Sequence, residues 1–228
     1  MQIVYCIDAA ALPLFRMSAA SVRKFNPEAK ITVISTAPLD TGCDNLVVKM
    51  PAANYRHTPN DRLSDATYLR IFLPDFLPGV SKVIYLDADT ICTGPLDELW
   101  EITPAYLAAT HSHDYGIKQA QQIGIDVYSL DSVLVMNLKA LRKTGFVKNF
   151  IAALDHAQFP RTNFYAAETV LNVCFRELIQ PLDLRWNYCH NRRYTQYADR
   201  IEEKDARIIH FIGPDKSPMK DCFASVVK

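Results

Sequence analysis

Two carboxylates one residue apart, Asp87 and Asp89, follow a short apolar run at residues 82–86 (KVIYL). Such a run is typical of a strand that is buried on both faces. Charges at its end are costly unless something neutralises them. A divalent cation that accepts oxygen ligands would do so, and it could also bridge to a diphosphate. Asp87-Ala88-Asp89 therefore predicts a metal-dependent phosphate site, with simple turn capping by the two acids as the alternative.

The elements that must position these acids form an alternating pattern of strands and helices. Strands are predicted at residues 2–7, 31–35, 45–49, 82–86, 106–110, 132–136 and 207–212, with helices after Pro13 and at residues 64–72 and 166–178. The alternation indicates an α/β fold with a mostly parallel sheet. Ligands bind at the carboxyl ends of strands in such sheets, which is where Asp87 and Asp89 are expected.

Composition narrows the class of protein. The 228 residues contain no repeat, low-complexity stretch or linker, so a single domain over residues 1–228 is predicted. Lysine and arginine number 25, as do the acids, so the basic excess typical of nucleic-acid binding is absent. Neither a membrane-spanning apolar run nor a signal-peptide pattern is present, and we expect a cytoplasmic protein with no transmembrane segment. The six scattered cysteines are predicted to be reduced thiols.

Several segments together resemble one known family. The stretch KVIYLDADTICTGPLDELW resembles the metal-binding segment of family 8 glycosyltransferases, and ATYLRIFLP, SVLVMNL, LRWNY and IIHFIGPDKSP resemble further segments, so the resemblance covers nearly the whole chain. The family includes bacterial lipopolysaccharide galactosyl- and glucosyltransferases and glycogenin. The resemblance implies a single Rossmann-like domain of GT-A type with a mostly parallel mixed sheet. It also implies retaining transfer of a hexose from a UDP-linked sugar to a saccharide or glycolipid acceptor.

The resemblance also implies roles for single residues. Asp87, Asp89 and His210 would be ligands of Mn(II), with Mg(II) as the alternative. Lys216 would bind the diphosphate, and Gly213 would let the backbone approach it. Asp8 would contact the uracil or ribose, and Arg70 would reach the sugar and diphosphate. Imidazole is a reasonable Mn(II) ligand, and lysine supplies a point charge for phosphate. Each residue also has a simpler interpretation: His210 as a core residue, Asp8 as a turn residue, and Arg70 as a helix residue with its head in water.

The departures from the family pattern gather where the donor's base and sugar would bind. Ala9, Ala10 and Ala11 follow Asp8 where the family has polar and aromatic residues. The family motif N-[AS]-G is replaced by Leu130-Asp131-Ser132, and the pair D-Q by Ala167-Glu168. The motif K-P-W is replaced by Lys216-Ser217-Pro218. We expect Asp131 to take over a hydrogen bond to the sugar. Glu168 is predicted to support an oxocarbenium-like transition state electrostatically. The alternative is an acid in the first helical turn, favoured by the helix dipole.

The acceptor side is less defined. His111, His113, Asp114 and Tyr115 form one polar stretch and Asn187, Tyr188, His190, Arg192, Arg193 and Tyr194 a second, and either sugar recognition or an ordinary surface loop would account for them. Membrane-associated relatives carry a basic aromatic tail. The residues after Lys216 show no such tail, so we expect no strong membrane anchor from them, although contact with the inner face of the membrane stays open.

Two other functions fit part of the pattern. The segment VIYLDADT also satisfies D-x-D-x-T of haloacid-dehalogenase-type phosphatases, with Asp87 as nucleophile and Asp89 as acid/base. That motif usually opens its domain, whereas here it follows three predicted strands. A non-catalytic sugar-nucleotide-binding protein with an eroded sugar pocket is the other alternative.

Overall fold

A seven-stranded sheet forms the centre of the computed structural model, which describes residues 1–53, 55, 64–112, 114–154, 165–190 and 201–227. Its strands are β1 (Gln2–Cys6), β2 (Lys30–Ser35), β3 (Asp44–Val47), β4 (Val83–Leu86), β6 (Leu107–His111), β7 (Ser129–Met136) and β8 (Ile179–Leu182). Their order is β3-β2-β1-β4-β7-β6-β8. Strand β7 is antiparallel to both neighbours and the other pairs are parallel. The mostly parallel mixed sheet is confirmed.

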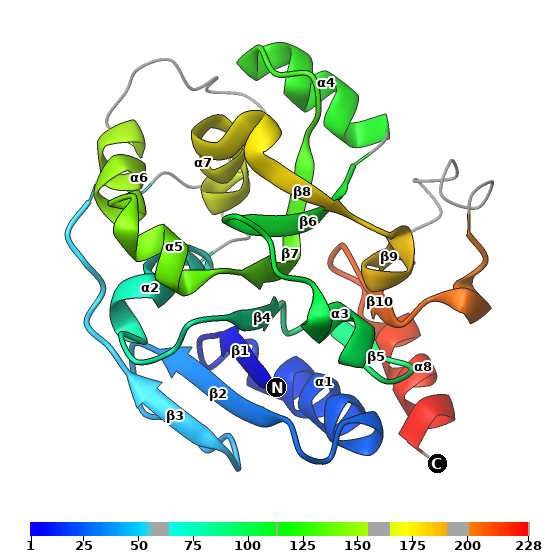
Figure 1. Ribbon diagram of the computed structural model, residues 1–228. Helices are drawn as coiled ribbons and strands as arrows, with labels where there is room; N and C mark the ends of the chain where they lie inside the picture. The colour runs from blue at the N-terminus through cyan, green and yellow to red at the C-terminus, as the bar shows by residue number, and fades with distance from the viewer. Residues whose placement is uncertain (54, 56–63, 113, 155–164, 191–200, 228) are drawn as a thin grey trace.

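Helices cover both faces of this sheet (Figure 1). Successive side chains of a strand point to opposite faces, so Val4 packs on one side while Ile3 and Tyr5 pack on the other. The first side is covered by the 3₁₀ helix η1 (Asp65–Phe72) and by α2 (Leu73–Phe76), α5 (Leu138–Lys143), α6 (Phe146–Leu154) and α7 (Ala166–Phe175). The second side is covered by α1 (Leu12–Phe25) and α3 (Asp97–Glu101).

A second, three-stranded sheet lies beside the first and consists of β5 (Thr90–Cys92), β10 (Ile208–His210) and β9 (Tyr188–Cys189), in that order. The turn at residues 87–89 connects β4 of the large sheet to β5 of the small one. Helix α8 (Ser217–Val227) packs against α1. The remaining elements are α4 (Asp114–Ile123), η2 (Arg176–Leu178), η3 (Leu184–Trp186) and η5 (Glu203–Asp205).

Some local predictions need correction. The helix predicted at 64–72 is the 3₁₀ helix η1, and the side chain of Ser64 before it makes no capping hydrogen bond. The helix predicted at 166–178 ends at Phe175, because Arg176 adopts a positive φ of 42° and starts the 3₁₀ turn η2. All six cysteines are free. Among the described residues, every helix is too short or too polar to span a bilayer.

Candidate functional site

The predicted acids meet at one edge of the large sheet. Asp8 follows β1 and Asp87 follows β4, and these two strands are parallel neighbours. Asp131 lies on the adjacent strand β7, and the Asp87 amide donates to the carbonyl of Ser132 at 2.8 Å. The carboxylate of Asp8 accepts from the amide of Ala11 at 3.0 Å, so it also holds the turn between β1 and α1.

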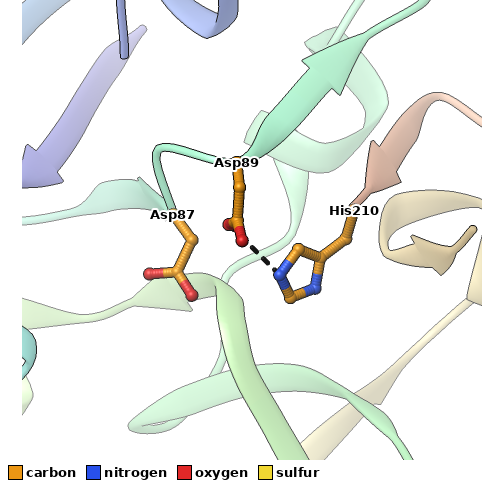
Figure 2. A group of neighbouring side chains, drawn as sticks. All are labelled: Asp87, Asp89 and His210. Atoms are coloured by element: carbon orange, nitrogen blue, oxygen red, sulfur yellow. Dashed lines mark ion pairs between the residues drawn. The ribbon is translucent and has the colours of Figure 1, made fainter. Parts of the chain in front are cut away.

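Asp87, Asp89 and His210 converge from both sheets. Strand pairing of β5 with β10 places His210 opposite Thr90, and the amide of Phe211 donates to the Asp89 carbonyl at 2.9 Å. One ligand atom from each of the three side chains lies within 4.8 Å of the others (Figure 2). Two carboxylates and an imidazole are a donor set that fits Mn(II) or Mg(II), and small side-chain movements would bring all three to bonding distance of one ion.

The carboxylate of Asp89 is surrounded by positive groups. His210 Nε2 lies 3.2 Å from one of its oxygens and Lys216 Nζ lies 2.7 Å from the other. Burial alone would raise the pKa of Asp89, but His210 and Lys216 outweigh it and hold this pKa below its usual range. Burial lowers the pKa of His210, and the charge and hydrogen bond of Asp89 reverse that and raise it well above its usual value. His210 is therefore an imidazolium when it is paired with Asp89.

Lys216 and Gly213 follow β10 on the way to α8. Lys216 also donates to the carbonyl of Phe211, which holds its ammonium group beside the acids. Gly213 has a positive φ of 100°, a conformation that favours glycine. The structure thus places the residues expected to contact a diphosphate next to those expected to bind the metal, while their contacts with a donor stay predictions.

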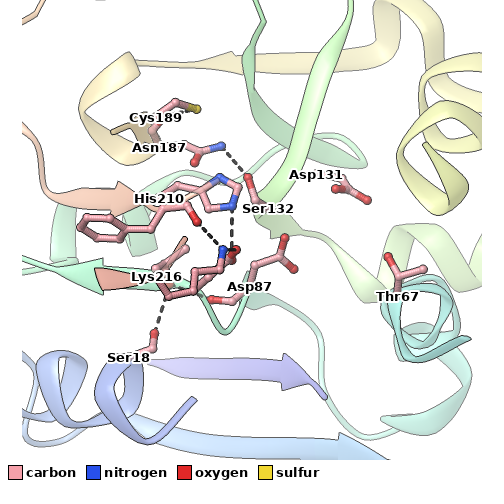
Figure 3. A network of polar contacts seen from close by, with 12 residues as sticks. Ser18, Thr67, Asp87, Asp131, Ser132, Asn187, Cys189, His210 and Lys216 are labelled. Atoms are coloured by element: carbon pink, nitrogen blue, oxygen red, sulfur yellow. Dashed lines mark hydrogen bonds and ion pairs between the residues drawn. The ribbon is translucent and has the colours of Figure 1, made fainter. Parts of the chain in front are cut away.

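Arg70 connects the two halves of the site. Its guanidinium lies 2.9 Å from Asp87 Oδ1 and 2.9 Å from Asp131 Oδ1, and it also donates to the Asp131 carbonyl and to Thr67. Figure 3 labels three residues that Arg70 contacts, Thr67, Asp87 and Asp131. The group stacks over the ring of Tyr85, and only 5% of the residue is exposed. The interpretation of Arg70 as a helix residue with its head in water is wrong.

Asp131 and Glu168 meet where the donor's sugar is expected to bind. The amide of Asp131 donates to Glu168 Oε2 at 3.3 Å, which joins β7 to the first turn of α7. Burial raises the pKa of Asp131 to about 6 even though Arg70 opposes this, and burial together with Asp131 raises the pKa of Glu168 well above its usual value. Ala167 is fully buried, whereas Ala9 and Ala10 are exposed.

The predicted acceptor stretches are only partly described. Asn187 is fully buried and donates to Thr110 Oγ1 at 3.1 Å and to Ser132 Oγ at 2.9 Å, a contact drawn in Figure 3. It therefore joins the small sheet to the large one and is not a surface residue. His190 pairs with Glu203 at 2.8 Å. His113, Arg192, Arg193 and Tyr194 lie outside the described residues.

Two residues that hold the acidic turn were missed by sequence reasoning. Tyr85 donates to the Asp87 carboxylate, and Thr90 Oγ1 donates to the Asp87 carbonyl at 2.8 Å. The Thr90 hydroxyl also lies 3.1 Å from that of Ser18, which in turn contacts the Tyr5 hydroxyl at 2.9 Å. The period of two along a strand puts Tyr85 on the same side as Asp87, so its spacing was a usable signal. Nothing in the local pattern indicates the contact between Ser18 and Thr90.

Replacing Thr90 with valine is expected to lower the free energy of unfolding by about 1–3 kcal/mol. The variant keeps the shape of the side chain but leaves the Asp87 carbonyl and the buried Ser18 hydroxyl without this partner. Urea unfolding measures the change. Thr103→Val is the control, because that hydroxyl is exposed and its loss should stay within about 0.5 kcal/mol. Equal losses in the free energy of unfolding for the two variants would contradict the prediction that Thr90 supports the turn.

Comparison with known proteins identifies a family. The profile of glycosyl transferase family 8 matches residues 20–218. The chain is 26% identical over 215 residues to a putative glycosyltransferase of Haemophilus influenzae, which covers 87% of this chain and 63% of that protein. It is 25% identical over 163 residues to the lipopolysaccharide glucosyltransferase WaaO of Escherichia coli, with 66% and 48% covered. For the lipopolysaccharide 1,3-galactosyltransferase of Salmonella typhimurium the identity is 23% over 163 residues, with the same coverage.

Solved structures show the same fold. The galactosyltransferase LgtC, in complex with donor and acceptor sugar analogues, superposes with a TM-score of 0.78 at 18% identity and covers 100% of this chain and 97% of that one. The glycosyltransferase GlyE of Streptococcus pneumoniae superposes with a TM-score of 0.73 at 20% identity, covering 99% and 59%. The fold is therefore of GT-A type.

The family match decides between the two enzyme classes that the D-x-D-x-T segment allowed, and it excludes the phosphatase. The chain spans between 48% and 63% of the lengths of these three relatives. Because the family profile matches most of the chain and the fold agrees, the chain belongs to glycosyl transferase family 8.

Proposed function

We propose that this protein transfers a hexose, galactose or glucose, from a UDP-linked sugar to a saccharide or glycolipid acceptor with retention at the anomeric carbon. The observation that carries this proposal is the convergence of Asp87, Asp89 and His210 beside Lys216 at the carboxyl edge of the sheet. The names of two relatives, a lipopolysaccharide glucosyltransferase and a 1,3-galactosyltransferase, support a hexose and a lipopolysaccharide-type acceptor.

Each residue would contribute through its own chemistry. Asp87, Asp89 and His210 would hold Mn(II), with Mg(II) as the alternative, and the bound cation would offset charge on the diphosphate. Lys216, which pairs with Asp89, would move to a phosphate oxygen once a metal ion neutralises Asp89. The backbone at Ala88 and Gly213 would line this end, and Asp8, which follows β1, would contact the uracil or ribose. Arg70 keeps Asp87 and Asp131 in place, and Asp131 and Glu168 would border the donor sugar.

Calorimetry with UDP-glucose and UDP-galactose, with and without Mn(II), tests the proposal. We expect binding of one donor that depends on the metal, followed by release of UDP when saccharide acceptors are added. Metal-dependent binding without transfer to any acceptor would favour the sugar-nucleotide-binding protein. If no nucleotide sugar bound with metal present, and Asp87→Ala changed nothing, the proposal would be refuted.

Binding of Mn(II) is expected to weaken as the pH falls. Asp89 raises the pKa of His210 well above its usual value, so the imidazolium must lose its proton before it can bind a metal. Below that pKa, each decrease of one pH unit should lower the apparent affinity for Mn(II) by up to about 10-fold. Calorimetry in two buffers of different ionisation enthalpy would detect the released proton. His190→Gln is the control, since this residue pairs with Glu203 outside the cluster, and its pH slope should match that of the wild type. An affinity independent of pH would contradict His210 as a ligand.

A further inference from the structure

A cleft of about 620 Å³ is lined by residues from β6, β8, η3 and η5 and by Arg207, which precedes β10. Pockets of about 300–1,000 Å³ are the usual size for small-molecule ligands. The lining of this cleft includes no residue of the metal cluster formed by Asp87, Asp89 and His210. The cleft is therefore a second candidate binding site, separate from the residues expected to hold the metal and the diphosphate.

The cleft opens at the same edge of the large sheet as the acidic turn. His111 ends β6 and Leu182 ends β8, and both strands run in the direction of β4, which ends just before Asp87. In the sheet, β6 and β8 stand two and three places from β4. Neighbouring strands lie about 4.8 Å apart, so the cleft lies about 10–15 Å from the end of β4 along this edge. An oligosaccharide spans such a distance, whereas a single sugar does not.

The cationic and anionic side chains of the cleft balance in number. Arg185 and Arg207 line it together with Asp183 and Asp205. A phosphate or carboxylate ligand would be attracted by the two arginines but repelled by the two acids. A neutral saccharide meets no such conflict, because each of its hydroxyl groups both donates and accepts hydrogen bonds. The balance of charge therefore favours a neutral saccharide over an anion.

The cleft offers hydrogen-bonding groups of both kinds. Arg207 is half-buried, and its guanidinium forms no hydrogen bond or ion pair within the described part of the chain. The same holds for the exposed carboxylate of Asp205. Arg185 pairs with Glu98, but its Nε is buried and lacks an acceptor among the described residues. A buried donor without a partner is costly, and a ligand oxygen would satisfy it.

Local contacts hold the two arginines in place. The amide of Arg207 donates to the carbonyl of Arg185 at 2.7 Å, and the Arg207 carbonyl accepts from the amide of Thr93 at 3.0 Å. The guanidinium of Arg185 stacks over the ring of Trp186. Gly94 leaves room for the stem of Arg207, since a Cβ there would lie 2.8 Å from Arg207 Cδ. Three apolar side chains also line the cleft: Pro181, Leu182 and Leu184. The C–H face of a sugar ring packs on apolar surface of this kind.

We propose that this cleft binds a neutral sugar unit of the acceptor, at a distance from the hydroxyl group that receives the hexose. Arg207 and Arg185 donate hydrogen bonds to oxygens of this sugar, and Asp205 accepts one from a hydroxyl group. The inference rests on the proposed transfer to a saccharide or glycolipid and adds a preference for an oligosaccharide acceptor over a single sugar.

Sugar binding is tested without metal or nucleotide sugar. The full protein is labelled with ¹⁵N-arginine, and the Nε–H signals of Arg185 and Arg207 are assigned by their loss in Arg185→Lys and Arg207→Lys. In the presence of EDTA, titration with maltotetraose and with cellotetraose should shift both signals saturably for at least one of the two sugars. The signal of Arg16, which pairs with Asp40 on the exposed surface, should not move. Unmoved Arg185 and Arg207 signals with both sugars overturn the proposal, whether or not the protein transfers a hexose.

Substitutions separate a saccharide site from an anion site. Arg207→Gln and Asp205→Asn should each weaken binding of the tetrasaccharide at least about 5-fold, because each removes a charged hydrogen-bonding partner. Arg16→Gln and Asp75→Asn, at exposed positions elsewhere, are the matched controls and should bind it as the wild type does. Glucose 6-phosphate that bound more tightly than the tetrasaccharide, and more tightly still to Asp205→Asn, would identify an anion site and overturn the proposal.

The role in acceptor choice is measured by release of UDP from UDP-glucose and UDP-galactose, with the bound tetrasaccharide or glucose as acceptor. In the wild type, kcat/KM should be at least about 5-fold higher for the tetrasaccharide, as expected for an added charge-assisted hydrogen bond. Arg207→Gln should reduce this preference mainly by raising KM for the tetrasaccharide, and Arg16→Gln should keep it. A preference that Arg207→Gln leaves unchanged, or equal kcat/KM for both acceptors in the wild type, overturns the proposal.

Discussion

Asp89→Asn is expected to reduce the rate of sugar transfer at least about 10³-fold. The substitution keeps the size of the side chain but removes a charged ligand from the proposed metal site, and charge stabilisation by a bound cation is worth several kcal/mol in such reactions. Metal-dependent binding of UDP-sugar, measured by calorimetry, should be lost with the activity.

The control for this variant is Asp215, which directly precedes Lys216 in the sequence. Asp215 is exposed and bonds to Ser217, so Asp215→Asn should retain the activity. Circular dichroism of both variants separates loss of the site from loss of the fold. Transfer by Asp89→Asn within 10-fold of the wild-type rate, at saturating Mn(II), would rule out Asp89 as an essential metal ligand.

Arg70→Met is expected to have the largest effect on stability, a loss of about 3–5 kcal/mol in the free energy of unfolding. Removing one partner of a buried ion pair leaves the other charge uncompensated, and here two carboxylates, Asp87 and Asp131, lose the same partner. Urea unfolding measures the change. Arg16→Met is the matched control, because the Arg16–Asp40 pair is exposed and should contribute at most about 1 kcal/mol.

A second substitution separates lost charge balance from lost packing. Asp131→Asn removes one of the uncompensated charges, so the double variant Arg70→Met/Asp131→Asn should recover part of the stability that Arg70→Met loses. The two residues are in direct contact, and such neighbours are expected to show non-additive effects. Strictly additive losses would mean that Arg70 stabilises the fold mainly through its stacking on Tyr85 and its bonds to Thr67.

Local pattern was sufficient for the parts of the fold with strong periodicity. Strand β4 is a continuous apolar run and its four residues are all buried, so both the strand and the acids at its end could be predicted. Strand β8 was missed because Gln180 and Pro181 interrupt its apolar pattern, which an edge strand tolerates. Strands β5 and β9, with three and two residues, are too short to have a period.

Single motifs predicted individual residues of the site, but not how residues far apart in the sequence come together. The acids of the turn, His210 and Lys216 were expected together only through family resemblance, since no local rule connects residues so far apart. The direction of Arg70 was not predictable, because its helix pattern does not say which polar side chain points inward. The contact between Asp131 and Glu168 joins residues 37 positions apart and depends on how α7 packs against β7.

The placement of the acidic turn between the two sheets has a consequence for how the protein is made. Lys216 lies 127 residues after Asp89 in the sequence, and β10 must pair with β5 before His210 can reach its partners. Closing so long a loop is slow relative to local structure formation. On the ribosome, the strands around Asp87 can therefore assemble well before the site exists. Until β10 has been synthesised, the nascent chain presents Asp89 without His210 and Lys216, the two cations that neutralise it in the finished protein.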